Sequence, residues 1–286
     1  MDGHPDRENL RVLSWNLFHG RDRPPDPSLY TRRSKWCRRP ERGARYAQVN
    51  RSLLPEFSAA LARDPWGVAL LQEVPPRWLA PLCAATGAAG ASALTARFFG
   101  MGLRGRLADL NPDLVGAWEG GSNQLLVRPP WRIEEVSRLT LTREPQRRRT
   151  VGVLARDEHG ASVAIGNVHL SVHDRVAAAL EAELAAAHLD RWSGGAPMLL
   201  GGDFNLRPES SPEIFDLLER RFGLTGAEVP SAIDHLLVSG ADRSPTASLL
   251  PDDWREPVDA GTGLRLRLSD HEPVVAEFVL RARRVG

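Results

Sequence analysis

The sequence predicts a mixed α/β fold formed by one domain. Apolar runs typical of strands recur from end to end of the 286 residues, and segments with helical periodicity lie between them. The composition does not change along the chain, and its 42% hydrophobic content is sufficient for a substantial core. We therefore expect a single domain over residues 1–286, with its core over about 10–280.

Strands are expected where short apolar runs end at polar or turn-forming residues. These runs cover residues 10–18, 67–74, 123–128, 150–156, 161–171, 197–205, 232–239 and 272–280. Two segments without a clear pattern, 19–42 and about 86–121, are expected to be long loops. Loops of such length in a compact domain are usually functional or disordered.

The clearest helix is expected over residues 175–192, because apolar residues recur there on one face. That face consists of Val176, Leu180, Leu184 and Ala187. A face of this kind ordinarily packs on the core of a globular protein. Asp174 can cap the start of the helix, and two glycines follow its end.

Three further helices are expected. Ser211 is a candidate cap for one of them, with Pro212 at its first position. Weaker patterns cover about 44–62 and 76–85, and Pro55 is expected to kink the first of these.

Charge and composition exclude several classes of protein. The formal net charge is +1, which indicates neither a strongly basic nucleic-acid binder nor an acidic tail. Lys35 is the only lysine, so biased composition can account for many of the arginines. Cys37 and Cys83 are too few for a disulfide framework or a zinc ribbon.

No apolar segment of the chain approaches the roughly 20 residues that a membrane helix needs. The N-terminus mixes both charges and has no apolar leader. We expect a cytoplasmic protein without a membrane span and without an obligate protein partner.

Polar residues stand at the ends of the expected strands: Asn16, Glu73, His169, Asp203, Asn205, Asp234 and the pair Asp270 and His271. Alternate side chains of an extended segment share a face, so Asp203 and Asn205 point the same way. Gly201 and Gly202 before them leave room for a group to approach the backbone, which suits a cation or a phosphate. Each residue alone has an ordinary explanation, such as a turn, a solvated strand end or a satisfied core histidine. Their conjunction favours one hydrolytic site, because a buried acid or imidazole needs a partner or a metal.

The motifs "WNLFHG", "LLQEV", "NVHLS", "GGDFN", "IDHLLVS" and "SDHEPV", in this order, resemble the endonuclease/exonuclease/phosphatase superfamily. The resemblance extends over about 10–280, and its most specific parts are "GGDFN" and "SDHEPV". It implies a four-layer α/β/β/α sandwich of two packed mixed sheets flanked by helices, with the active site in a cleft at one edge. It also implies Mg²⁺ or Mn²⁺ as cofactor and hydrolysis of a phosphate ester by water.

The resemblance further implies which residues hold the metal. Glu73 corresponds to the main metal-binding glutamate, with Asn16 beside it and Asp270 completing or bridging the metal shell. Oxygen ligands of this kind suit Mg²⁺, which keeps several waters and also binds substrate phosphate.

The remaining motif residues match catalytic roles in the superfamily. Asp203 and Asn205 correspond to the pair that positions the attacking water and holds a phosphate oxygen. His271 corresponds to the general base oriented by Asp234, with Asp203 as the competing base. His169 corresponds to a donor to the negative charge that develops on phosphorus.

One position departs from the pattern of the superfamily. Some members place an acid two residues after the first asparagine, where this chain has Phe18, so we expect one dominant cation site centred on Glu73. His19, which follows, is a candidate for substrate contact through phosphate, and Asn123 is a second candidate substrate-binding residue.

Substrate choice depends on loops rather than on the fold. The segment "YTRRSKWCRRPERGAR" interleaves arginines with Tyr30 and Trp36, which suits nucleic acid, and "REPQRRR" over 143–149 could extend a basic rim. An ordinary solvated surface explains these arginines equally well. We expect a phosphodiesterase or nuclease; the alternatives are a phosphatase or phosphodiesterase of a small phosphoester or lipid headgroup, and a catalytically silent binding protein.

Overall fold

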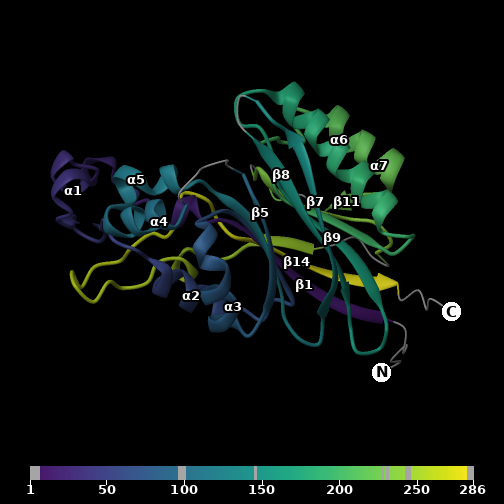
Figure 1. Ribbon diagram of the computed structural model, residues 1–286, viewed down its shortest axis with the longest axis horizontal. Coiled ribbons are helices and arrows are strands. Elements are labelled where there is room, and N and C mark those ends of the chain that lie inside the picture. The colour runs from purple at the N-terminus through teal and green to yellow at the C-terminus, as the bar shows by residue number, and fades with distance from the viewer. Residues whose placement is uncertain are drawn as a thin grey trace.

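The computed structural model describes residues 7–95, 101–144, 147–226, 229, 232–241 and 246–281. Two mixed sheets pack face to face, and helices cover both outer faces (Figure 1). Helices α2 (Leu54–Arg63) and α3 (Leu79–Thr86) lie on the first sheet, while α6 (Arg175–Trp192) and α7 (Pro212–Phe222) lie on the second. The predicted four-layer α/β/β/α order is therefore confirmed.

The first sheet has the strand order β13-β14-β1-β4-β6-β5. Its strands are β1 (Arg7–Asn16), β4 (Val68–Val74), β5 (Ala89–Leu94), β6 (Ser122–Val127), β13 (Thr246–Leu249) and β14 (Val274–Arg281). Strands β1 and β4 run parallel, whereas the other neighbours pair antiparallel.

The second sheet has the order β11-β12-β10-β9-β8-β7. Its strands are β7 (Arg132–Thr142), β8 (Arg148–Arg156), β9 (Ser162–His169), β10 (Met198–Asp203), β11 (Thr225–Gly226) and β12 (Asp234–Val238). Here β9 and β10 form the parallel pair, and the other neighbours are antiparallel. Each sheet thus has one parallel pair near its middle.

Aliphatic side chains such as Leu70, Ile165 and Leu199 fill the space between the sheets. Buried polar contacts cross between the sheets, among them those of Asn167. The Asn167 Nδ2 donates to the carbonyls of Leu71 at 2.9 Å and Gln124 at 2.7 Å, and its Oδ1 accepts from Gln72 Nε2 at 2.8 Å. Because unpaired polar groups are costly in a core, these contacts specify how the two sheets align.

All eight predicted strands are present, with ends displaced by a few residues. Strands β5, β7, β11 and β13 of the two sheets were not predicted. Strand β7 is mostly polar and lies at a sheet edge, and β5 consists largely of small residues, so neither has an apolar run. The predicted loop over about 86–121 is wrong, because β5, α4 (Met101–Leu110) and α5 (Pro112–Glu119) occupy it.

Helix α6 has the predicted bounds, and Asp174 caps it by accepting from the Ala177 amide at 3.0 Å. Its orientation differs from the prediction. The apolar side chains Val176, Leu180 and Leu184 are exposed, with 72%, 57% and 49% of their surface accessible. The alanines pack on the sheet instead: Ala178, Ala182, Ala185 and Ala186. Small side chains let the helix lie close to the sheet, so packing distance rather than hydrophobicity decides the buried face.

The other helix predictions are partly correct. Helix α7 begins at Pro212, although Ser211 makes no side-chain capping bond. The prediction over 44–62 begins too early: α2 starts at Leu54, and Pro55 lies in its first turn, where proline is tolerated without a kink. The prediction over 76–85 is confirmed as η3 (Pro76–Trp78) followed by α3.

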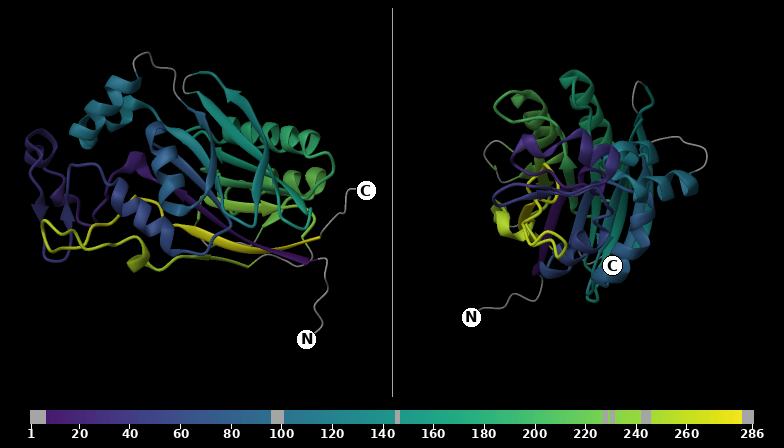
Figure 2. Two further views of the ribbon diagram at one scale, coloured as in Figure 1. Left: turned by 60° about the horizontal axis from the view of Figure 1, so that its bottom comes forward. Right: turned by 90° about the vertical axis from the view of Figure 1, so that its left-hand side faces the viewer.

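Short elements occupy the segment 19–42, which was expected to be a loop. They are η1 (Phe18–Gly20), η2 (Pro27–Leu29), α1 (Arg32–Cys37) and β2 (Glu41–Arg42), which pairs with β3 (Ala47–Gln48). Helices α1, α4 and α5 gather at the end of the molecule opposite the two termini (Figures 1 and 2). Within the described residues, no helix has the length and apolar character to cross a membrane.

Candidate active site

Strand direction brings the predicted residues to one edge of the two sheets. The parallel pair of the first sheet ends at Asn16 and next to Glu73, and the parallel pair of the second ends at His169 and Asp203. Strands β12 and β14 run antiparallel to these pairs, so their first residues lie at the same edge. Asp234 begins β12, and His271 precedes β14.

The two glycines before Asp203 serve packing. A Cβ at Gly202, where φ is 128°, would lie 2.1 Å from the Val168 carbonyl of the neighbouring strand. A Cβ at Gly201 would lie 2.7 Å from Leu70 of the opposite sheet. The prediction that these glycines admit a cation or phosphate is therefore wrong, because strands of the protein itself fill the space.

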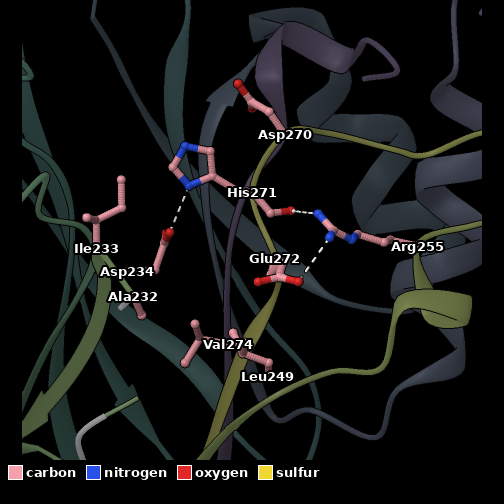
Figure 3. A pocket seen from close by; sticks show the side chains of 9 residues that line it. All are labelled: Ala232, Ile233, Asp234, Leu249, Arg255, Asp270, His271, Glu272 and Val274. Atoms are coloured by element: carbon pink, nitrogen blue, oxygen red, sulfur yellow. Dashed lines mark hydrogen bonds and ion pairs between the residues drawn. The ribbon is translucent and has the colours of Figure 1, made fainter. Parts of the chain in front are cut away.

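His271 and Asp234 form a hydrogen-bonded pair across the two sheets. The His271 Nδ1 lies 2.8 Å from Asp234 Oδ2 (Figure 3). Its Nε2 lies 3.8 Å from Asp203 Oδ2. Burial disfavours the charge on His271, but the hydrogen bond and charge of Asp234 outweigh burial and raise its pKa to about 10. The ring is therefore anchored at Nδ1, while Nε2 is directed towards the other site residues.

Asp203 lies at the centre of the cluster and is almost fully buried. The Asn16 Nδ2 donates to Asp203 Oδ2 at 3.0 Å, and the backbone N–H of Asn205 donates to Asp203 Oδ1 at 3.1 Å. Burial, followed by the charge of Asp234, raises the pKa of Asp203 to about 7. A carboxyl group with this pKa can exchange a proton near neutral pH.

Glu73 is more accessible than Asp203 and Asp234. Its backbone is strained, with φ at 51°. The Nε2 of His19 lies 3.2 Å from Glu73 Oε2, and Nε2 of His169 lies 3.8 Å from Oε1. His19 is strained as well, with φ at 53°. Positive φ at bulky residues persists only where surrounding contacts hold it, and it is frequent at functional sites.

The half-buried imidazole of His19 and the buried imidazole of His169 flank this acid. Burial lowers the pKa of His19, and burial together with the charge of Arg148 lowers that of His169 well below its ordinary value. Both rings are therefore neutral near pH 7. A neutral ring can still donate one hydrogen bond, which is the role predicted for His169.

Arg148 is a site residue that the sequence did not single out. It begins β8, only 6% of it is exposed, and the charges of Glu181, Asp203 and Glu73 reach it. The segment "REPQRRR", which contains it, was expected only to extend a basic rim. The position of Arg148 was the signal that indicates this role, because it begins a strand whose following residues are mostly buried.

Three further residues predicted for the site, Asp270, Asn205 and Asn123, differ from one another in exposure and contacts. Asp270 is exposed and follows the buried Ser269, whereas the Asn205 side chain donates to the Leu170 carbonyl at 3.0 Å. Asn123 is fully buried, and its Nδ2 donates to the Arg149 carbonyl at 2.7 Å. Asn123 therefore contributes to the contact between the sheets and presents no exposed atom to a substrate.

Three residues that the sequence did not single out hold the segment around His271. The Ser269 hydroxyl donates to the Asn16 carbonyl at 2.6 Å and accepts from the His271 amide at 3.1 Å. Trp15 donates to the His271 carbonyl at 3.1 Å. Arg255 donates to the same carbonyl at 2.8 Å (Figure 3). The backbone of His271 is thus fixed from three directions.

A hard divalent cation fits the donors on one side of the cluster. Glu73 carries carboxylate oxygens, and Asn16 carries an amide oxygen that also accepts from the Phe18 backbone amide at 3.0 Å. The charges of Glu73 and Asp270 both act on His19. Within the described part of the chain, no three His, Cys, Asp or Glu side chains form a ready-made metal cluster. One or two carboxylates with several waters is the usual arrangement for Mg²⁺.

Several solved structures share this fold at low sequence identity. An endonuclease/exonuclease/phosphatase family protein from Bacteroides thetaiotaomicron is 18% identical, with a TM-score of 0.63 over 96% of this chain and 98% of that one. A mannosyl-6-phosphatase of the same organism is 18% identical, with a TM-score of 0.62 over 95% and 100%. The human Nocturnin catalytic domain is 15% identical, with a TM-score of 0.61 over 95% and 97%.

None of the curated protein sequences compared with the chain gives a significant match. The family model described as "Endonuclease/Exonuclease/phosphatase family" matches residues 13–271. This span includes every site residue described above. The chain therefore belongs to the endonuclease/exonuclease/phosphatase family of phosphoester hydrolases.

Proposed function

We propose that the protein is a divalent-cation-dependent phosphodiesterase, of the kind that cleaves nucleic acid, in which Asp234 and His271 assist the attack of water. The observation that supports this most is the contact between His271 Nδ1 and Asp234 at 2.8 Å. It leaves Nε2 directed towards Asp203, within the cluster that includes Glu73 and Asn16.

The position of each residue in the site indicates its role. His271 holds a proton at Nε2 near neutral pH, because its pKa is raised to about 10, and it can act as base only after releasing that proton; its Nδ1 is occupied by Asp234. Asp203 positions the attacking water, and its raised pKa makes it the second candidate for the base. Glu73, Asn16 and Asp270 would hold Mg²⁺ or Mn²⁺, which, when bound, polarises the phosphate and neutralises charge.

Two residues of the second sheet act on the phosphate. His169 is neutral and donates to an oxygen on which negative charge develops. Arg148 contributes a permanent positive charge from within the same cluster. Both are held on strands, which gives a fixed geometry before substrate binds.

The decisive experiment is a hydrolysis assay with bis(p-nitrophenyl) phosphate, plasmid DNA, single-stranded DNA and RNA, in Mg²⁺, Mn²⁺ or EDTA. We expect hydrolysis that EDTA abolishes. His271→Ala and Asp203→Ala should each lower kcat by about 10²- to 10⁴-fold while the circular dichroism spectrum is unchanged. Full activity of His271→Ala would rule out the histidine as base.

A second candidate function is hydrolysis of a small phosphoester. The fold likeness to a mannosyl-6-phosphatase supports it, as does a basic cavity of about 310 Å³ beside the cluster, which could take a compact anion. Adding sugar phosphates to the assay separates the two functions. Absence of hydrolysis on every substrate would favour a binding protein on the same fold.

A further inference from the structure

A basic cavity of about 310 Å³ lies beside the candidate active site. Its principal lining residues are Phe18, Arg21, Arg23, Tyr30, Lys35 and Asp113. They come from η1, the segment after it, α1 and α5, which lie at the end of the molecule opposite the termini (Figures 1 and 2).

The backbone of η1 connects the cavity to the catalytic cluster. Phe18 and His19 are consecutive and both have positive φ, 47° and 53°. His19 contacts Glu73 at 3.2 Å, whereas Phe18 lines the cavity. Since consecutive Cα atoms are only about 3.8 Å apart, one substrate molecule can occupy both places.

The cavity carries a net positive charge. The Arg21 guanidinium lies 4.0 Å above the Phe18 ring, and that of Arg23 lies 4.8 Å from the Tyr30 ring. Among the described residues, neither these two arginines nor Lys35 forms an ion pair with a carboxylate. The one acid in the lining, Asp113, is half-buried and accepts from Gln48, and burial raises its pKa.

Buried polar contacts hold the walls of the cavity in place. Gln48 of β3 is fully buried; it donates to Asp113 of α5, and its Oε1 accepts from Ser34 of α1. Asn50 Nδ2 donates to Asn111 Oδ1 at 2.7 Å and to the Ser34 carbonyl at 3.1 Å. These contacts fix α1 and α5 on the same support, so the cationic side chains are arranged before a ligand arrives.

We propose that this cavity binds a second phosphate group of the substrate, next to the phosphate ester that is cleaved. The inference rests on the proposed function and adds what the substrate must carry. Arg21 uses its Nε for the Phe18 carbonyl at 3.3 Å, so its terminal N–H groups, with those of Arg23, are the donors that would meet a phosphate. Three cations together favour a group with more than one negative charge. The second phosphate belongs either to a neighbouring nucleotide or to a small bisphosphate.

Two substrate pairs distinguish these sources, since each pair differs by one phosphate. The first is the thymidine dinucleotide with and without a 5′-phosphate, and the second is fructose 1,6-bisphosphate against fructose 6-phosphate. For one of the two pairs, the wild-type kcat/KM should be about tenfold or more higher for the doubly phosphorylated substrate than for the singly phosphorylated one. The difference should come mainly from a lower KM. The pair that responds identifies the source.

The variants test the residues. In the double variant Arg23→Gln and Lys35→Gln, the ratio of kcat/KM for the doubly phosphorylated substrate to that for the singly phosphorylated one should fall to about one. Arg23→Lys should keep part of this preference. Arg132→Gln, which changes an exposed arginine of β7 far from the cavity, is the matched control and should keep all of it. The singly phosphorylated substrates should react equally in every variant.

A binding measurement gives a readout without turnover. Titration of inorganic pyrophosphate in EDTA should give a Kd about tenfold weaker for the double variant than for the wild type. Equal Kd values, or equal rates for both members of both pairs, would overturn the inference while leaving hydrolysis intact. If EDTA and His271→Ala leave hydrolysis unchanged, the proposed function fails instead.

Discussion

The two ring nitrogens of His271 have different surroundings, and this difference determines its chemistry. Nδ1 is bonded to Asp234, and Nε2 lies among the other site residues. The raised pKa of His271 means that the folded protein binds a proton more tightly than the unfolded chain does, whose histidine pKa is about 6.5. Its contribution to stability is therefore complete below about 6.5 and is lost as the pH rises through about 10.

The direction of this pH dependence of stability can be tested on the protein in EDTA. His271→Gln should lower the free energy of unfolding by on the order of 2 kcal/mol at pH 6, and the difference should shrink towards pH 10. Urea denaturation at pH 6, 8 and 10 measures it. His159→Gln, at an exposed position, is the control. A difference that stays constant with pH would contradict the assigned proton linkage.

His19 is the residue whose side chain contacts the proposed main metal ligand, Glu73. Its neutral ring can orient the carboxylate by donating to Oε2. His19→Ala should therefore raise the Mg²⁺ concentration for half-maximal activity by about tenfold, with little change in kcat at saturating Mg²⁺. Activity titrations with Mg²⁺ measure this, and the exposed His173→Ala serves as control. An unchanged Mg²⁺ requirement would remove this role from His19.

At the scale of the element, α6 shows that an apolar pattern does not by itself choose the buried face. The helix has alanines on one side and larger apolar residues on the other, and both sides read as hydrophobic. Its bounds were predictable because Asp174 and the following glycines are local signals. The buried side was not, because it depends on how closely the sheet approaches.

The orientation of α6 gives a direct test. Leu184→Glu should change the free energy of unfolding by less than about 0.5 kcal/mol, because the side chain is half exposed. Ala182→Leu should destabilise by about 1–3 kcal/mol, because Ala182 is fully buried against the sheet. Thermal and urea denaturation of the two variants measure the contrast. The reverse order would mean that the helix packs with its leucines inward.

At the scale of the molecule, the site exists only because two sheets pack together. Asn16, Glu73 and His271 belong to the first sheet or its connections, whereas His169, Asp203 and Asp234 belong to the second. The bond between His271 and Asp234 crosses from one sheet to the other. Asn167 makes the buried contacts that align the two sheets.

Removing the contact at Asn167 should affect the whole molecule. Asn167→Ala removes the donor to the Leu71 and Gln124 carbonyls and one acceptor of Gln72 Nε2 in the core, so the free energy of unfolding should fall by about 2–4 kcal/mol. Activity should fall too, since His169 lies two residues further along the same strand. Asn9→Ala, at an exposed position of β1, should stay within about 0.5 kcal/mol of the wild type. Equal stability of both variants would show that the contact contributes little.

The sequence by itself determined which strands form the central framework and which polar residues end them, because apolar runs and the residues that stop them are local signals. The family motifs extended this to the layer order of the sandwich. Tertiary structure decided the rest. Which neighbours fill the space beside Gly201 and Gly202, which face of α6 is buried, and that Arg148 enters the cluster while Asn123 is enclosed all depend on chain segments distant in sequence. Local patterns cannot supply such information, because it arises only when separate elements pack against one another.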